Sequence, residues 1–88
     1  MVYVILLITA ANPEEARKIA ETLVGEKRVA CVNIIPQVQS LFCWQGEVCN
    51  ERETLMIIKS RRACVDQIIQ RVRQRHSYEV PEIIALPI

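Results

Sequence analysis

The chain has 88 residues, of which 51% are hydrophobic and only 5% are aromatic, so most of its apolar surface is aliphatic. A chain of this length forms one small domain, here residues 1–88, and buries only about 60–65% of its unfolded surface. So much aliphatic surface for one small core indicates burial between subunits. Eleven basic and ten acidic residues leave a net charge of +1, which provides no overall field to attract nucleic acid or an acidic membrane.

Neither a membrane span nor a disulfide framework is predicted. Residues 2–8 form the longest apolar run, far short of the roughly 18–20 residues that span a bilayer, and no charged segment or cleavage site precedes them. The four cysteines would permit two disulfides, but Cys31 and Cys64 lie in apolar periodic segments, where free cysteine behaves as a small hydrophobe. We therefore expect Cys31, Cys43, Cys49 and Cys64 to be reduced, in a cytoplasmic protein.

The first half of the chain predicts a strand, a helix and a second strand. Residues 2–8 (VYVILLI) are a short, β-branched apolar run that is typical of a buried strand. Asn12 can then cap a helix whose first position suits Pro13, and Gly25 marks its end. One face of this helix carries apolar residues at helical spacing, namely Ala16, Ile19, Ala20, Leu23 and Val24. Residues 29–35 (VACVNII) predict the second strand.

The second half repeats this plan about fifty positions later. Residues 54–60 (TLMIIKS) predict a strand, Ser60 can cap the next helix, and residues 80–88 predict the last strand, with Pro81 at its start. The apolar stripe of the second helix is Val65, Ile68, Ile69 and Val72. Right-handed crossovers in a β-α-β-β-α-β chain give a ferredoxin-like α+β fold, with a four-stranded antiparallel sheet and both helices on one face.

The segment between the two halves predicts an unusually long hairpin. Two strand-forming arms, residues 29–44 and 47–60, surround a Gln45–Gly46 turn. A fourteen-residue arm spans about 45 Å, whereas a compact domain of this size is only about 30 Å across. The hairpin therefore overhangs its own domain, with a bend at Pro36. Such a ribbon cannot leave apolar residues at its tip uncovered; these are Leu41, Phe42, Trp44 and Val48.

A two-residue turn also fixes the register of the hairpin tip. Residue 43 then opposes residue 48, and residue 42 opposes residue 49. Cys43 and Cys49 consequently point to opposite faces of the ribbon, which argues against a disulfide and against a shared metal. Trp44, beside the turn, is more typical of a packing anchor in a subunit contact than of a ligand platform.

Four separate motifs carry a family resemblance. They are ACVNIIP (residues 30–36), W-x-G (44–46), MIIKS (56–60) and H-x-YEVPEIIALP (76–87). In order and spacing they resemble the CutA family of divalent-cation-tolerance proteins. The resemblance implies a ferredoxin-like subunit in a tight homotrimer with interlocking hairpins, similar in architecture to the trimeric PII signal proteins. It also implies an association with copper and other divalent ions, and no established catalytic reaction.

The chain departs from the family pattern in three places. Ser77 stands where most members have proline, and Ile8 stands where some bacterial members carry a cysteine that is implicated in copper binding. Family members also continue past the position of Ile88 into a helix and a short terminal segment. From the last difference we expect that part of the trimer contact or of a pocket cover is missing.

The residues that precede the last predicted strand are candidates for metal binding. His76, Glu79 and Glu82 offer an imidazole nitrogen and carboxylate oxygens, which are ligands for a divalent ion. Their spacing is not diagnostic by itself, and a solvated loop is the alternative interpretation. The resemblance favours a weak Cu²⁺ site, with no obligate cofactor.

Lys59 and Tyr78 support a second hypothesis, a PII-like regulatory trimer that binds a small anionic effector between subunits. For Lys59 the alternative is plain solvation or an ion pair. The sequence has no nucleophile–base pair and no phosphate-binding loop, so a catalytic function is not predicted. We therefore expect a non-enzymatic homotrimer whose partners are itself and a divalent ion, rather than nucleic acid or a membrane.

Overall fold

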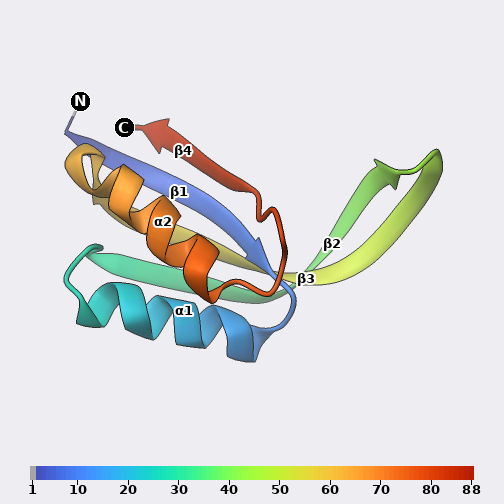
Figure 1. Cartoon of the computed structure of the whole chain (residues 1–88), viewed down its shortest axis with the longest axis horizontal. Helices are drawn as coiled ribbons and strands as arrows, with labels where there is room; N and C mark the ends of the chain where they lie inside the picture. Colours follow the sequence, from blue (N-terminus) through green and yellow to red (C-terminus); the bar gives the residue numbers. More distant parts are fainter. Residues whose placement is uncertain (1) are drawn as a thin grey trace.

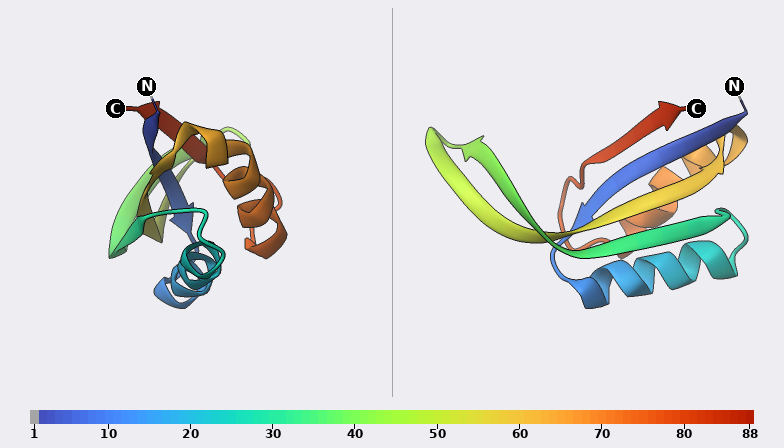
Figure 2. Two further views of the ribbon diagram at one scale, coloured as in Figure 1. Left: turned by 90° about the vertical axis from the view of Figure 1, so that its left-hand side faces the viewer. Right: turned by 180° about the vertical axis from the view of Figure 1, so that it is seen from behind.

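The computed structural model describes residues 2–88 and has the predicted α+β architecture (Figure 1). One antiparallel sheet has the strand order β2-β3-β1-β4, and both helices lie on the same face of it (Figure 2). The elements, in chain order, are β1 (Tyr3–Ala10), α1 (Pro13–Gly25), β2 (Cys31–Trp44), β3 (Glu47–Arg61), α2 (Val65–Arg75) and β4 (Ile83–Pro87), with a 3₁₀ turn (Arg62–Cys64) before α2.

Local sequence signals position the first helix as predicted. The side chain of Asn12 accepts a hydrogen bond from the backbone N–H of Glu15 at 2.8 Å, and Pro13 begins the helix. This cap satisfies one of the N–H groups that a helix N-terminus leaves without a partner. The helix ends at Gly25, also as predicted.

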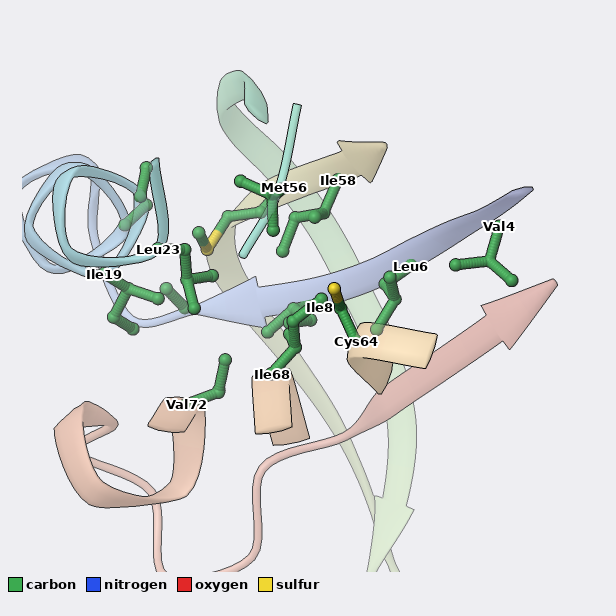
Figure 3. Packing of buried hydrophobic residues seen from close by; sticks show 14 residues of the cluster. Val4, Leu6, Ile8, Ile19, Leu23, Met56, Ile58, Cys64, Ile68 and Val72 are labelled. Atoms are coloured by element: carbon green, nitrogen blue, oxygen red, sulfur yellow. The ribbon is translucent and has the colours of Figure 1, made fainter. Parts of the chain in front are cut away.

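The hydrophobic core lies between the helices and one face of the sheet (Figure 3). Alternate residues of β1 point into it, because successive side chains of a strand point to opposite faces. The core residues labelled in the figure are all buried; they are Val4, Leu6, Ile8, Ile19, Leu23, Met56, Ile58, Cys64, Ile68 and Val72. The helical stripes and strands predicted from apolar periodicity therefore meet in a single core.

Two predicted element boundaries are wrong. Ser60 does not cap the second helix: it lies within β3, and its hydroxyl donates to the carbonyl of Arg28 at 2.6 Å. Helix α2 begins at Val65 with no side-chain cap, because the 3₁₀ turn intervenes. The last strand is also shorter than residues 80–88, since Pro81 is buried ahead of β4 rather than placed at its start.

The long hairpin overhangs the sheet, as predicted (Figure 1). Residues 54–61 of β3 pair with β1, and residues 55–59 pair with β2 as well, whereas residues 47–53 pair with β2 alone. Gln45 and Gly46 both have positive φ, of 52° and 79°, which matches the twist of a two-residue hairpin turn. The predicted register is confirmed, because Cys43 opposes Val48 and Phe42 opposes Cys49.

The hairpin bends where the predicted kink lies, at Pro36. Ile35 pairs with Leu55 and Val38 with Glu53, so Pro36 and Gln37 together oppose Thr54. This is a β-bulge, which bends and twists a strand. Proline suits it because its missing N–H would interrupt a regular ladder. The hydroxyl of Thr54 donates to the carbonyl of Pro36 at 2.9 Å and fixes the bend.

The second face of the sheet is also apolar. Within residues 2–88 no helix covers it (Figure 2), and cross-strand pairing places its residues side by side. They include Ile5, Leu7, Ile35, Ile57, Ile84 and Leu86, which are half-buried or exposed. Ile84 and Leu86 are 42% and 46% exposed, so a second apolar layer remains without a cover in a single subunit.

Candidate functional site

His76 is a buried residue of the segment that connects α2 to β4. Its side chain is fully buried, so the solvated-loop interpretation is wrong for this residue. Nε2 lies 2.7 Å from the carbonyl oxygen of Thr9, and Nδ1 accepts a hydrogen bond from the backbone N–H of Tyr78 at 3.0 Å. Because a carbonyl can only accept and an N–H can only donate, the proton is on Nε2. Both ring nitrogens are thus occupied within the protein.

Glu15 connects this segment to the first helix. Its carboxylate accepts from the backbone N–H of Ala11 at 3.1 Å and from that of Ser77 at 3.0 Å, and one oxygen lies 3.7 Å from Nδ1 of His76. Burial raises the pKa of Glu15, but the bonds from Ser77 and Ala11 and the nearby His76 outweigh that effect and lower the pKa below its usual value.

The lowered pKa of Glu15 predicts a contribution to acid stability. Because the folded-state pKa is below the unfolded value of about 4.3, this contribution is fully present above the unfolded value and is lost as the pH falls through the folded one. We expect Glu15→Gln to lose less stability than the parent between about pH 6 and about pH 3. Urea denaturation at several pH values measures this, with the exposed neighbour Glu14→Gln as control. Parallel pH profiles for Glu15→Gln and the parent would contradict the prediction.

The connecting segment and the hairpin together line an open hollow of about 690 Å³. We call it the hairpin hollow. Three of the four aromatic residues of the chain line it, together with three carboxylates and Arg52. These aromatic and acidic residues are Phe42, Trp44, Tyr78, Glu51, Glu53 and Glu82. The hollow thus combines aromatic faces with an excess of negative charge.

Tyr78 connects the buried histidine to the hairpin. Its ring lies against that of His76, with the centroids 4.6 Å apart, and its hydroxyl donates to Glu53 on β3 at 2.6 Å. Burial, followed by the hydrogen bond to the Glu53 carboxylate, raises the pKa of the Tyr78 hydroxyl well above its usual value. Tyr78 therefore stays neutral and remains a donor at physiological pH.

The structure separates the predicted metal-binding residues. Glu82 lines the hairpin hollow, whereas Glu79 is exposed outside its lining. His76 is buried, and it does not line the hollow either. Over residues 2–88, no three His, Cys, Asp or Glu side chains form a group that could hold a metal ion. One subunit therefore does not assemble His76, Glu79 and Glu82 into a metal centre.

The predicted effector residues also lie apart. Tyr78 contacts Glu53, whereas Lys59 is six positions further along β3, about 20 Å away in an extended strand. Lys59 lines a different hollow, of about 440 Å³, at the other end of the sheet. Of the four predicted contact residues, Phe42 and Trp44 line the hairpin hollow, while Leu41 and Val48 are exposed near the tip, at 68% and 80%.

Sequence reasoning missed Glu51 and Glu53. They are two residues apart on β3, so they share a face of the strand, and cross-strand pairing adds Phe42 to that face through Cys49. The alternation of side chains along β3 could have shown from the sequence that Glu51 and Glu53 share a face. It could not have shown that Tyr78 lies beside Glu53, because the folded segment between α2 and β4 brings these two residues together.

Comparison with known proteins identifies the family. The family model described as CutA1 divalent ion tolerance protein matches residues 4–88. The chain belongs to the CutA1 family. Among its relatives, the chloroplastic CutA 1 protein of rice is 40% identical over 97% of this chain and 48% of its own length. The divalent-cation tolerance protein CutA of Thermus thermophilus is 45% identical over 96% of this chain and 82% of its own length.

Solved structures of the CutA1 family have the same fold. The Thermus thermophilus protein superposes with a TM-score of 0.95 at 44% identity, over 98% of this chain and 84% of that one. A PII-like CutA from Nostoc superposes with a TM-score of 0.88 at 36% identity, over 97% of this chain and 80% of that one. The chain spans about half the length of the rice and Arabidopsis relatives.

Membership of the CutA1 family does not by itself fix a compartment, since the rice relative is chloroplastic. In residues 2–88 neither helix has the length and apolar character needed to cross a membrane. The family names quoted above describe ion tolerance rather than a reaction.

Two of the departures from the CutA1 pattern now have a structural context. Ile8 is 1% exposed and faces the helices, so position 8 belongs to the core of this subunit. Ser77 donates its backbone N–H to Glu15, and a proline at this position would lack that donor. The serine therefore permits one hydrogen bond between the His76 segment and Glu15 of α1 that the usual family residue cannot form.

Proposed function

We propose that this chain acts in divalent-cation tolerance as a non-catalytic, cytoplasmic homotrimer that binds a divalent ion weakly, with Cu²⁺ favoured. The observation that carries the proposal is the CutA1 match over residues 4–88. Two features of the subunit support the assembly: the uncovered apolar face of the sheet and the overhanging hairpin with its exposed tip. Burying both against further copies would remove apolar surface from water.

The carboxylates of the hairpin hollow support an ion-binding role. Glu51, Glu53 and Glu82 line a common hollow, and carboxylate oxygens are ligands for divalent cations. Because the described residues of one subunit do not bring three such ligands together, the hollow would supply only part of a coordination shell, which agrees with weak binding. His76 is a less accessible donor, because ligation through Nδ1 would break its bond with the Tyr78 N–H. Cu²⁺ is favoured over Zn²⁺ by the general affinity order for divalent metals, and affinity is expected to be modest because thiolate ligands are absent from the proposed set.

Glu82 and Glu79 provide a matched test of the metal proposal. We expect Glu82→Gln to weaken Cu²⁺ binding by about tenfold or more, the loss that even outer-shell partners of a metal cause. Glu79→Gln should bind like the parent, because Glu79 does not line the hollow. Calorimetric titration of Cu²⁺ at neutral pH measures both. Unchanged binding by Glu82→Gln would contradict the proposed site, and a loss confined to His76→Ala would favour imidazole ligation instead.

A second candidate function is a PII-like regulatory trimer with a small anionic effector between its subunits. The specific observation in its favour is the set of basic residues around Lys59, in a family that includes a PII-like member. Since Lys59 and Tyr78 line different hollows of one subunit, an effector that contacts both would have to bridge two subunits.

A further inference from the structure

A polar hollow of about 460 Å³ lies between helix α2 and the loop that follows α1. Both helices cover the face of the sheet opposite the uncovered apolar face (Figure 2). The trimer proposed above buries the apolar face and the hairpin, so this hollow stays open to solvent in the assembly. Six residues line it, and all are polar or charged: Glu26, Arg28, Gln67, Gln70, Arg71 and Gln74. We call it the helix hollow.

Glu26 connects the two arginines of the helix hollow. One carboxylate oxygen accepts from Nε of Arg28 at 2.9 Å, and the other accepts from Nη2 of Arg71 at 2.6 Å. The bonds from Arg71, and then those from Arg28, lower the pKa of Glu26 to about 2, so the carboxylate is charged at physiological pH. The three side chains are only 27–31% exposed. Both guanidinium groups are therefore positioned before any ligand binds.

Two glutamines of α2 extend this network. The side-chain oxygen of Gln67 accepts from Nη1 of Arg28 at 2.6 Å, and that of Gln74 accepts from Nη1 of Arg71 at 2.9 Å. Because a guanidinium has donors and no acceptor, the amide oxygen of each glutamine faces its arginine and the amide nitrogen does not. The NH₂ groups of both glutamines consequently take no part in these bonds and are donors for a further group.

The helix hollow is richer in donors than in acceptors. Both oxygens of Glu26 and the side-chain oxygens of Gln67 and Gln74 already accept from arginine. A guanidinium has five N–H donors, and this network uses two from Arg28 and three from Arg71. Two arginines and one glutamate also leave the lining with an excess of positive charge. A ligand that supplies acceptor oxygens and negative charge would satisfy what remains.

We infer that the helix hollow binds a small organic oxyanion, one with a phosphate or several carboxylates on a polar body. Arginine is well suited to both groups. Nε of Arg28 and Nε of Arg71 contact the same oxygen of Glu26, at 2.9 and 3.1 Å, so one ligand can reach both guanidinium groups. The volume falls within the usual range of small-molecule sites. The positive charge disfavours a metal cation, and the polar lining disfavours an apolar ligand.

This inference goes beyond the proposed function, because it requires neither a divalent ion nor the residues Lys59 and Tyr78. The ideas can therefore fail separately. Glu82→Gln, which tests the metal proposal, should leave oxyanion binding at the helix hollow unchanged.

The test is calorimetric titration of the whole protein, at low ionic strength, with glycerol 3-phosphate and with citrate. These two probes separate the phosphate and carboxylate forms of the ligand. Inorganic phosphate serves as a probe of charge alone and glycerol as a probe of the polar body alone. We expect at least one of the two organic anions to bind more tightly than either comparison compound. If neither organic anion binds, or if inorganic phosphate binds as tightly as both, the inference is overturned.

Two variants locate the binding in the helix hollow. Arg28→Gln removes one of the two guanidinium groups, and we expect it to weaken binding of the organic anion by about tenfold or more, since hydrogen bonds to a charged ligand are lost. Gln70→Glu adds a negative charge to the lining, although Gln70 takes no part in the bonds that hold the arginines. It should also weaken binding, by repulsion, and it keeps the test valid if Arg28→Gln is poorly folded.

The matched control is Arg73→Gln, at an exposed position of α2 outside the lining. It lowers the net charge by one, as the other two variants do, and should bind the organic anion like the parent. Equal weakening by all three variants would overturn the inference in favour of net charge. Parent-like binding by both Arg28→Gln and Gln70→Glu would overturn it too, because the anion would then bind elsewhere.

Discussion

Replacing Trp44 by alanine is expected to dissociate the proposed trimer. Trp44 is 63% exposed in the single subunit and lies at the end of β2, opposite Glu47. If a neighbouring copy buries it as a protein core would, its removal costs about 3–5 kcal/mol. Light scattering on eluting protein should then give the parent as a trimer of about three times 10.1 kDa, and Trp44→Ala as a smaller species at low concentration.

Val24→Ala is the matched control for this experiment. Val24 is also an exposed hydrophobic residue, at 48%, but it lies on α1, away from the hairpin. We expect it to leave the mass unchanged. A folded monomer for the parent would contradict the assembly, and a parent-like mass for Trp44→Ala at every concentration would place the subunit contact elsewhere.

Replacing His76 by alanine should destabilise the subunit itself. The substitution removes the partners of the Thr9 carbonyl and the Tyr78 N–H and leaves space beside the Tyr78 ring. A buried group that loses its hydrogen-bond partner costs about 1–3 kcal/mol, so the two together predict a loss of roughly 2–6 kcal/mol in the free energy of unfolding. Urea denaturation at neutral pH measures the loss.

Tyr78→Phe provides the comparison for His76→Ala. It keeps the aromatic ring against His76 but removes the hydrogen bond to Glu53, and a bond to a charged group contributes about 1.5–3 kcal/mol. We expect a smaller loss than for His76→Ala, since Glu53 remains partly accessible to water. If the two variants are equally stable, the histidine contributes no more than the tyrosine hydroxyl, and its central role in the segment is contradicted.

Much of the fold could be predicted because its signals are local. The Asn12–Pro13 helix start, the Gln45–Gly46 turn and the alternation of apolar residues each depend on a few neighbours in sequence. The predicted element boundaries were wrong where contacts between distant parts of the chain determine the structure. Ser60 resembles a helix cap, but its hydroxyl bonds to Arg28, which is distant in sequence. The last strand begins only at Ile83, and the segment before it is held by Tyr78, whose N–H bonds to His76 and whose hydroxyl bonds to Glu53.

The candidate sites were less predictable than the fold. Proximity in sequence suggested that His76, Glu79 and Glu82 act together, yet the compact turn after α2 buries the first and exposes the second. The hypothesis of an anionic effector placed Lys59 and Tyr78 in one pocket. In the structure Tyr78 bonds to Glu53, and Lys59 lies six residues further along the extended strand β3, so the two residues line different hollows. The environment of each residue depends on contacts between distant segments, which spacing alone does not encode.

The β-bulge at Pro36 and Gln37 limits how this protein could change in length during evolution. A strand alternates its faces with a period of two, so adding one residue beyond the bulge would turn every following side chain to the opposite side. Adding two residues to each arm would keep Phe42 and Glu51 on their present side while extending the hairpin by about 7 Å. Related proteins with longer or shorter hairpins are therefore expected to differ from this chain in steps of two residues per arm.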